Sequence, residues 1–351
     1  MTQPVPVKEE KKETLCPLFG SCGGCQYQDI SYEEELCRKE MILKEILRKE
    51  IDLPDAMFDS SAASPEKYHY RSRLDLTLRR RNNGEWQMGF MLQGTQRLQD
   101  VLACSIARKE INDFLPKLRE DAIKIFPPNY KVANLVVRVG EEGRVFWGGI
   151  GRRSLRMQEE NYFWVHVRGK KIFYSLDTFF QANLFILEKL LARINELIPW
   201  QDRTVLLDLY SGVGLFGISL ADRAQEVVMI EESADSVKLA QYNVAHHHFE
   251  HVKILTGKVE THLPEVLKDL AGRPCVGLID PPRGGLASSA IEALSRADGL
   301  PSLFYLSCSP ESLARDLKQL ILAGWRIQKV MPFDFFPRTR HLETLVWLAR
   351  C

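Results

Sequence analysis

Cys308 follows an apolar, β-rich run, Phe304 to Ser307, and precedes Ser309-Pro310. This pattern predicts a strand that ends at the thiol and a helix that begins directly after it. Asp280 ends a second apolar run, and a glycine loop, Gly212-Val213-Gly214, follows a third. Ligands bind at the carboxyl ends of the strands in a parallel α/β sheet, so the three strand ends are expected to meet in one crevice. A thiol beside an acid and a glycine loop is expected to be a nucleophile, although a single cysteine is more often a small buried hydrophobic residue.

The glycine loop, Gly212 to Gly217, matches the pattern G-x-G-x-x-G. Glu231 ends the next predicted strand, nineteen residues after Gly212, where a carboxylate would accept hydrogen bonds from ribose hydroxyls. Both features fit NAD as well as S-adenosylmethionine. Asp208 and Tyr210 stand between the strand and the glycines, and a carboxylate there would repel a diphosphate but favour a sulfonium-bearing amino acid. The loop therefore favours S-adenosylmethionine over a dinucleotide.

Three cysteines near the N-terminus, Cys16, Cys22 and Cys25, have the spacing C-x5-C-x2-C on a glycine-rich loop. Thiolates this close can bind a metal centre, and a fourth ligand has to come from elsewhere in the chain. The spacing is nearer to ferredoxin-type iron–sulfur runs than to the paired motifs of zinc ribbons, with zinc as the alternative. It differs from the C-x3-C-x2-C run of the radical S-adenosylmethionine enzymes. The candidates for the fourth ligand are Cys37, Cys104, Cys275 and Cys351.

The composition of the 351-residue chain is that of an ordinary globular protein, with 45% hydrophobic residues. The net charge is +1, so any surface for a nucleic acid must be a local patch. No apolar run approaches the length of a membrane span, and the N-terminus lacks the order of a signal peptide, so we expect a cytoplasmic protein without a membrane partner. In that compartment eight cysteines indicate metal binding or catalysis, not disulfides.

The chain divides into a polar tail at 1–14, a β-rich region and an alternating α/β region. The tail is expected to be disordered. Ser31 and Glu34 form a capping-box pattern for a helix over 31–50. Strand patterns with one helix, at about 105–124, fill the region up to residue 175. Further helices, beginning with 179–198, separate five predicted parallel strands, and an antiparallel pair is expected to complete a seven-stranded sheet. These strands are at 204–209, 226–231, 252–256, 275–280, 302–307, 325–331 and 343–349.

Basic residues gather in two parts of the β-rich region, and the first of them also contains Tyr68, His69 and Tyr70. Charged runs are usually solvated faces, but arginines among aromatic residues indicate contact with RNA through phosphates and stacked bases. The first group is Lys67, Arg71, Arg73, Arg79, Arg80 and Arg81. The second is Arg144, Arg152, Arg153, Arg156, Arg168, Lys170 and Lys171.

Together these features resemble the RNA 5-methyluridine methyltransferase family, the uracil-5 methylases of tRNA and ribosomal RNA. The resemblance covers nearly the whole chain. It rests on the cysteine run, on the loop Asp208 to Gly214, and on four further motifs. These are Phe180-Gln181-Ala182-Asn183, Asp280-Pro281-Pro282-Arg283, Ser307-Cys308-Ser309-Pro310 with Ala314-Arg315-Asp316-Leu317, and Phe336-Pro337-Arg338-Thr339-Arg340-His341-Leu342-Glu343.

The resemblance implies an α/β fold: a Rossmann-like class I methyltransferase domain at 176–351 with a mostly parallel seven-stranded sheet. A smaller β-rich domain at 15–175 is implied to bind RNA and an iron–sulfur cluster, with the helix at 31–50 packed on the catalytic domain. The chain starts close to the cysteine run, so the N-terminal RNA-binding barrel of some members is expected to be absent. A monomer is expected.

The family's functional residues map onto matching positions of this chain. They imply a [4Fe–4S] cluster on Cys16, Cys22, Cys25 and Cys104, S-adenosylmethionine contacts at Gln181, Tyr210, Gly212, Glu231 and Asp280, a nucleophile at Cys308 and a base at Glu343. Leu215, Lys258 and Ser309 depart from residues that are common in the family, which leaves cofactor contacts at 215 and 258 open.

The implied reaction begins when the Cys308 thiolate adds to carbon-6 of an unstacked uracil, because the resulting enolate is nucleophilic at carbon-5. Carbon-5 takes the methyl group, Glu343 removes the carbon-5 proton, and the thiol is eliminated. A strand end beside a helix N-terminus is expected to lower the thiol pKa. No step needs electrons, so the cluster is expected to be structural.

Two other functions fit part of the sequence. An RNA cytosine-5 methyltransferase also uses a cysteine at carbon-6, but it usually has a second cysteine where Arg283 stands, and it lacks the N-terminal cysteine cluster. A non-catalytic iron–sulfur protein that binds RNA or senses redox state would need neither Cys308 nor Glu343. The motifs therefore favour a uracil-5 methyltransferase, with its RNA and its uridine left open.

Overall fold

The structure is a computed structural model that describes residues 14–92, 94–151 and 154–350. Apart from Thr14, the predicted tail at 1–14 lies outside the described residues, as do Arg152, Arg153 and Cys351. None of the helices within the described ranges has the length and apolar character needed to cross a membrane.

Seven strands form the larger sheet in the order β10-β9-β8-β11-β12-β14-β13. Strands β8 to β12 run parallel, and β14 is antiparallel to both of its neighbours. This confirms the predicted α/β fold with a mostly parallel seven-stranded sheet. The strands are β8 (Val205–Leu209), β9 (Glu226–Glu231), β10 (Val252–Thr256), β11 (Cys275–Ile279), β12 (Ser302–Ser307), β13 (Trp325–Phe333) and β14 (Glu343–Arg350).

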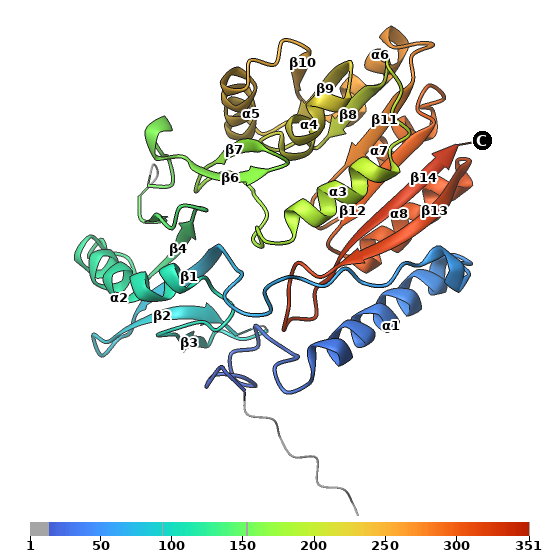
Figure 1. Ribbon diagram of the computed structural model, residues 1–351. Coiled ribbons are helices and arrows are strands. Elements are labelled where there is room, and N and C mark those ends of the chain that lie inside the picture. Colours follow the sequence, from blue (N-terminus) through green and yellow to red (C-terminus); the bar gives the residue numbers. More distant parts are fainter. Residues whose placement is uncertain (1–13, 93, 152–153, 351) are drawn as a thin grey trace, which may run out of the picture.

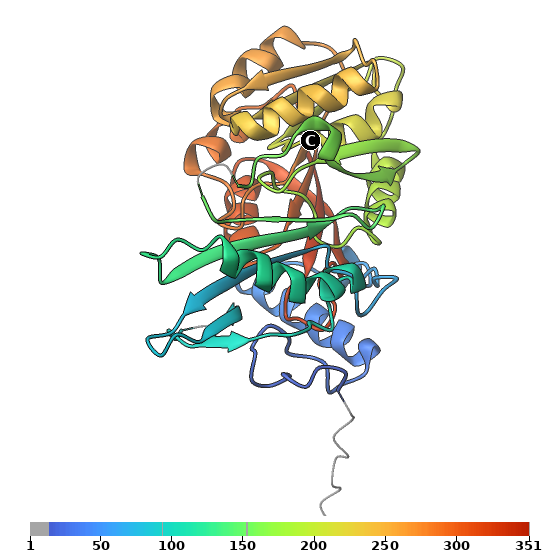
Figure 2. The ribbon, with the colours of Figure 1, turned by 90° about the vertical axis from the view of Figure 1, so that its left-hand side faces the viewer.

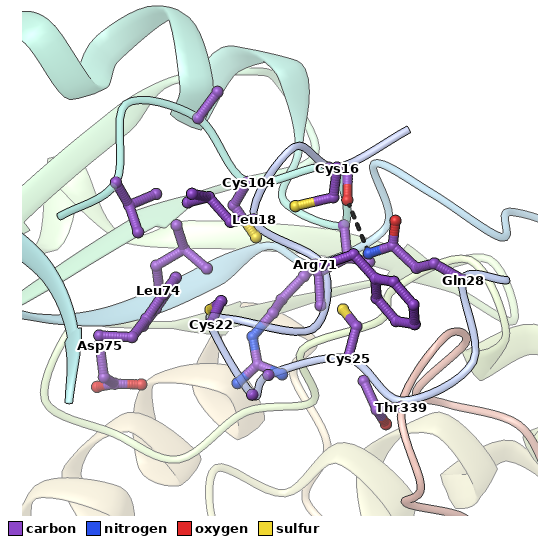
Figure 3. A pocket seen from close by; sticks show the side chains of 18 of the residues that line it. Cys16, Leu18, Cys22, Cys25, Gln28, Arg71, Leu74, Asp75, Cys104 and Thr339 are labelled. Carbon is purple, nitrogen blue, oxygen red and sulfur yellow. Dashed lines mark hydrogen bonds between the residues drawn. The ribbon is translucent and has the colours of Figure 1, made fainter. Parts of the chain in front are cut away.

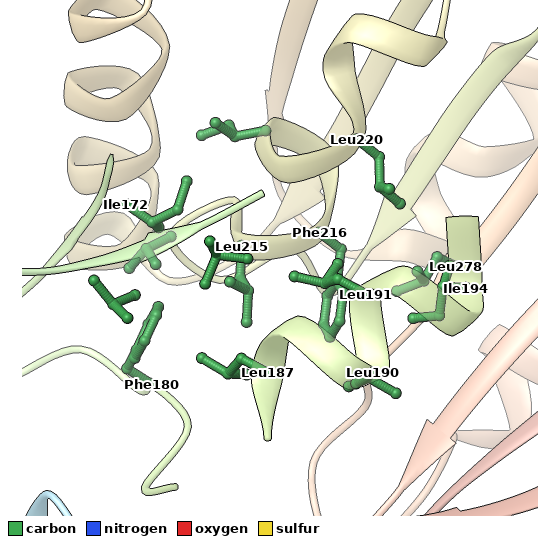
Figure 4. Close-up of a cluster of buried hydrophobic side chains, with 14 of the residues drawn as sticks. Ile172, Phe180, Leu187, Leu190, Leu191, Ile194, Leu215, Phe216, Leu220 and Leu278 are labelled. Atoms are coloured by element: carbon green, nitrogen blue, oxygen red, sulfur yellow. The ribbon is translucent and has the colours of Figure 1, made fainter. Parts of the chain in front are cut away.

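Helices cover both faces of this sheet (Figure 1). Alternate side chains of a strand point to opposite faces, so Leu206 lies in one buried cluster and Leu207 in the other. The first cluster contains side chains from α3 (Leu187–Leu197), α4 (Leu215–Leu220) and α5 (Ala234–His246), part of which Figure 4 shows. The second contains side chains from α6 (Val259–Asp269), α7 (Ser288–Ser295) and α8 (Pro310–Leu322).

The N-terminal helix α1 (Tyr32–Glu50) packs beside α8 on the second face (Figure 1). Ser31 caps it by accepting a hydrogen bond from the Glu34 backbone N–H at 3.1 Å. Leu43 and Leu47 are buried in the cluster of that face. The helix therefore joins the N-terminal part of the chain to the layer that carries α8.

A smaller antiparallel sheet, in the order β3-β2-β1-β4-β5, lies beside the larger one (Figures 1 and 2). Helix α2 (Lys109–Lys124) covers one of its faces, where Ile111, Leu115 and Leu118 meet Leu76 and Leu135. The strands are β1 (Arg73–Arg80), β2 (Trp86–Met91), β3 (Leu98–Asp100), β4 (Val132–Val139) and β5 (Val145–Gly148). Strands β2 and β3 were not predicted from the sequence.

A hairpin of β6 (Phe163–Val167) and β7 (Lys170–Tyr174) precedes the residues that lead into α3. Phe163 and Tyr174 are buried in the same cluster as Leu187 and Phe216, so the hairpin shares the core of the larger sheet. The division of the chain at 175/176 stays a prediction. Short 3-10 turns occur at Asp55–Met57, Glu159–Asn161 and Ala221–Arg223.

Candidate active site

The carboxyl ends of β8, β11 and β12 lie side by side, because these strands are neighbours in the sheet. Ile279 of β11 is level with Leu209 of β8 and with Tyr305 of β12. Asp280 and Tyr210, the next residues of β11 and β8, therefore leave adjacent strands at the same level. Cys308 follows the last residue of β12. The structure thus brings the predicted thiol, acid and glycine loop to one edge.

Glu343 joins this group from the antiparallel strand β14. Ser307 of β12 pairs with Thr344 of β14, so the register places Glu343 next to Cys308 at the ends of neighbouring strands. The side chain is 4% exposed, and its Oε2 has no hydrogen-bond partner among the described residues. Burial, with a smaller effect from Asp280, raises the pKa of Glu343 well above its usual value. A carboxylate held this way is a strong proton acceptor whenever it is ionised.

The Cys308 thiol is half-buried, and its pKa is raised to about 11. Burial is the main cause, the charges of Glu343 and Asp280 add to it, and Arg283 opposes it. The expectation of a lowered thiol pKa is therefore wrong for the free protein. Burial of the thiol, together with the charges of Glu343 and Asp280, outweighs any effect of the helix end. The N-cap of α8 is Ser309, whose hydroxyl accepts a hydrogen bond from the Ser312 backbone N–H at 3.3 Å.

Gln181 lies beside Asp280, with its amide Nε2 3.5 Å from the Asp280 Oδ2. Gln181 is buried and Asp280 is partly exposed, and desolvation raises the pKa of Asp280 to about 7. The predicted helix at 179–198 begins only at Leu187, so Gln181 lies on a loop. Asn183 stabilises this loop because its amide donates to the Ser64 hydroxyl at 3.0 Å and to the Phe335 carbonyl at 3.1 Å.

The glycine loop is held by two acids. Glu231 accepts hydrogen bonds from the backbone N–H groups of Gly212 at 2.9 Å and Ser233 at 2.7 Å. Asp208 is fully buried and accepts from the Gly217 N–H at 2.7 Å, and burial raises its pKa to about 7. A β-carbon at position 217, in the first turn of α4, would lie 3.0 Å from the Asp208 carboxylate and 2.8 Å from the Met229 sulfur, so a larger residue there would displace these side chains.

Two residues that the sequence did not single out stand close in the chain to Gln181 and Glu343. Phe179 is 69% exposed although it stands two residues before the buried Gln181. His341 is half-buried, and its Nδ1 lies 3.5 Å from an Arg283 nitrogen. Burial and the charge of Arg283 lower the pKa of His341 to about 4. The sequence contains no sign that, of Phe179 and Phe180, only the first is exposed.

The four predicted metal ligands line one cavity of about 250 Å³ (Figure 3). Cys16, Cys22 and Cys25 come from the N-terminal loop, and Cys104 precedes α2. Burial raises the pKa of Cys25 to about 12 and also raises the pKa values of Cys22 and Cys104. Cys37 and Cys275 do not line the cavity.

Bringing the cysteines together does not by itself make a metal centre. In the described part of the chain, no three His, Cys, Asp or Glu side chains are grouped so that they could hold one metal ion. Neither the iron–sulfur cluster nor the zinc alternative is therefore shown, and the cluster stays a prediction.

Both basic groups contain residues that are held in ion pairs. In the second, Lys170 is buried and pairs with Asp222, and Arg144 pairs with Glu142 at 3.0 Å. In the first, Arg73 pairs with Asp75 at 2.7 Å and Arg81 with Glu85 at 3.5 Å, whereas Arg80 is exposed at the end of β1. Arg80 makes the first group a candidate for an RNA-facing surface.

Comparison with known proteins identifies the family. Residues 152–351 match the family model described as tRNA (Uracil-5-)-methyltransferase. An uncharacterized RNA methyltransferase of Clostridium tetani is 28% identical over 97% of this chain and 84% of its own length. The tRNA (uracil(54)-C(5))-methyltransferase of Schizosaccharomyces pombe is 27% identical over 97% of this chain and 67% of its own.

The fold of the whole chain is also shared. The crystal structure of Pyrococcus abyssi tRNA (uracil-54, C5)-methyltransferase, in complex with S-adenosyl-L-homocysteine, superposes with a TM-score of 0.74 at 23% sequence identity. The superposition covers 95% of this chain and 86% of the Pyrococcus abyssi chain. Since the family model matches more than half of its residues, this chain belongs to the tRNA (uracil-5-)-methyltransferase family and is an S-adenosylmethionine-dependent RNA (uracil-5-)-methyltransferase.

Proposed function

We propose that this enzyme methylates carbon-5 of a specific uridine in tRNA or ribosomal RNA through a covalent bond between Cys308 and carbon-6 of the uracil. The observation that carries the proposal is the placement of Cys308 and Glu343 on the ends of adjacent antiparallel strands. One group attacks the ring and the other removes a proton from the neighbouring ring carbon, so the two must lie close together.

The reaction balances with these two residues and the methyl donor. The Cys308 thiolate bonds to carbon-6, and the ring electrons move to oxygen-4 to form an enolate. Carbon-5 then attacks the methyl group of the cosubstrate S-adenosylmethionine, and S-adenosylhomocysteine leaves. The Glu343 carboxylate takes the carbon-5 proton, the double bond re-forms, and the thiolate is expelled.

The methyl donor is proposed to lie against Gln181, Tyr210, Gly212, Glu231 and Asp280. Support comes from the glycine loop, where Tyr210 and Gly214 adopt left-handed backbone conformations with φ of 64° and 89°. Leu215 is buried in the hydrophobic core, so a side-chain contact at 215 has no support. A contact at Lys258 stays open.

The four cysteines are proposed to bind a structural [4Fe–4S] cluster. Support comes from their convergence on one cavity although Cys104 lies far along the chain from the others. Each thiolate of such a cluster binds a different iron, so the four sulfurs do not need to meet at a single point. The basic residues of β1 lie between Cys25 and Cys104 in the sequence, so the cluster is proposed to shape the RNA surface.

The RNA remains to be identified. Two relatives are named as methyltransferases of uridine 54 in tRNA, so that position is the first to test. The sequence argues against the cytosine-5 alternative, because Arg283 stands where its second cysteine is usual.

The test is a tRNA carrying 5-fluorouridine at the target. Fluorine on carbon-5 cannot be removed as a proton, so the wild-type enzyme is expected to form an adduct that survives denaturation. Cys308→Ala is expected to form none, whereas the control Cys37→Ala, which removes an exposed thiol on α1, should react normally. An adduct with Cys308→Ala would overturn the proposal.

A further inference from the structure

Residues 334–342 connect β13 to β14 and end directly before Glu343. This connection is neither helix nor strand, yet Asp334 and Phe335 are fully buried and Arg338 and Thr339 nearly so. Connecting segments normally run over the surface, because buried backbone polar groups need partners. The partners of this segment decide how Glu343 is held.

A buried ion cluster supplies the first set of partners. The Lys39 ammonium, on α1, donates to the Asp334 carboxylate at 2.8 Å and to the Phe336 carbonyl at 3.1 Å. It also pairs with Glu35, one turn earlier, at 2.7 Å. The Tyr32 hydroxyl donates to the other oxygen of Asp334 at 2.9 Å.

Both the backbone N–H and the backbone carbonyl of Arg338 are hydrogen-bonded. Its N–H donates to the Glu35 carboxylate at 2.6 Å, and its carbonyl accepts from the N–H groups of Gln26 and Tyr27 at 2.8 and 3.1 Å. Its backbone is left-handed, with φ of 69°, which is uncommon for a residue other than glycine. These bonds hold the segment in a conformation that it would not adopt alone.

The same segment also reaches the cysteine cavity. Thr339 and His341 line that cavity, and the Arg340 N–H donates to the Gln26 side chain at 2.9 Å. Gln26 directly follows Cys25 in the chain. The connection thus lies between the N-terminal layer and the strand that carries the catalytic base.

Ion pairs this deeply buried are poor sources of stability, because removing charges from water costs about as much as their attraction returns. Glu35, Lys39 and Asp334 are each at most 2% exposed. Where such pairs are retained, their best-attested use is to specify one arrangement among several. A base that must reach one ring proton requires such an arrangement.

We propose that Glu35 and Lys39 are positioning residues, which act through Asp334 and Arg338 to hold the 334–342 connection so that Glu343 can take the carbon-5 proton. The inference rests on the covalent mechanism proposed above and adds to it that the proton-removal step depends on α1. Cys308 follows the separate strand β12, so thiol addition is expected not to depend on this cluster.

The test separates these two steps in Lys39→Met. Turnover on ordinary tRNA is expected to fall about 10- to 100-fold, because small displacements of catalytic groups have effects of this size. Adduct formation with 5-fluorouridine RNA is expected to stay within about twofold of wild type, since it precedes proton removal. Methylated RNA with ordinary uridine should then remain bound to the variant protein.

Two further variants distinguish a positioning role from a general loss of stability. Lys49→Met, which breaks an exposed ion pair with Glu45 on the same helix, should leave both steps unchanged. Glu35→Gln keeps the size of the side chain and should also reduce turnover while adduct formation stays unchanged, but by a smaller factor. This variant replaces Lys39→Met in the test if Lys39→Met does not fold. Equal loss of both steps in Lys39→Met or in Glu35→Gln, or no loss in either, overturns the inference.

Glu343→Gln distinguishes the two proposals. If this variant does not retain methylated RNA, the covalent mechanism itself fails. If it does, and Lys39→Met and Glu35→Gln do not, only the positioning role fails.

Discussion

The carboxyl edge of the large sheet and the cysteine cavity both collect reactive side chains from distant parts of the chain, but they are built differently. At the sheet edge, strand register determines the positions of Asp280, Cys308 and Glu343. In the cavity, three of the four thiols lie on a loop of turns held by local bonds such as Cys22 N–H to the Leu18 carbonyl at 2.9 Å. The first region is organised by the backbone, whereas the second is expected to need its ligand.

The difference also appears in the acid–base chemistry. Asp208 and Glu343 are buried and Asp280 is partly exposed, and desolvation raises the pKa of all three acids at the sheet edge. Strongly shifted pKa values of this kind cluster at functional sites. Reactive groups that carry out chemistry can thus be placed by a rigid sheet, while a structural cluster can be placed by the metal itself.

The largest effect is expected from Glu343→Gln, which tests the sheet edge. Turnover should fall about 10²- to 10⁴-fold, the usual contribution of a general base. Methylated RNA should stay attached to Cys308 with ordinary uridine, because thiol addition and methyl transfer need no base. Mass spectrometry of the denatured complex gives the measurement. Normal turnover would remove Glu343 from the mechanism.

Cys104→Ser tests the cavity. Anaerobically purified wild-type protein is expected to be brown, with about four irons per chain. The variant should lose the iron and bind tRNA about tenfold more weakly, or by roughly 1.4 kcal/mol, while its affinity for S-adenosylmethionine stays nearly unchanged. Cys37→Ser, which lies outside the cavity, is the matched control. Stoichiometric zinc, or unchanged tRNA binding after iron loss, would contradict the proposed cluster.

The buried acids predict a pH dependence of stability. The pKa of Asp280 is raised to about 7 in the folded protein, and an unfolded aspartate titrates near ~3.9. Between these values the folded chain binds more protons, so this residue's effect on the free energy of unfolding becomes unfavourable as the pH rises. Asp280→Asn should therefore gain stability relative to wild type, on the order of 1–3 kcal/mol more at pH 8 than at pH 4. Urea unfolding of both proteins at pH 4 and pH 8 measures this. If the difference in the free energy of unfolding between variant and wild type is the same at both pH values, the pKa of Asp280 is not raised in the folded protein.

The smallest effect is expected from Arg80→Ala on the exposed end of β1. Loss of one phosphate contact should weaken tRNA binding a few-fold and reduce the slope of its salt dependence by about one. Turnover at saturating tRNA should not change. The control is Arg296→Ala, which removes an exposed cation from the end of α7. An equal effect of both variants would show that the β1 surface has no special part in RNA binding.

The sequence by itself determined the parallel strands and the residues that end them. Buried parallel strands are apolar runs, and β9 and β12 were predicted with the bounds that the structure has. The edge strand β10, whose Lys253 is exposed, was also predicted with its observed bounds. Cys308 and Asp280 could be identified as strand-end residues for the same reason. Strand β3 spans only Leu98–Asp100, which is too few residues for a pattern. Strands β2 and β7 are as long as β9 and β10 but were not individually predicted.

Only the tertiary structure decided which distant residues meet. The pairing of β12 with β14 places Glu343 beside Cys308, and the cavity selects Cys104 over Cys37 and Cys275. The raised thiol pKa and the buried pairing of Lys39 with Asp334 depend on neighbours in space that are far apart in the chain. Local patterns reflect neighbours in sequence, whereas burial, charge interactions and proton affinity are set by the folded environment of each group.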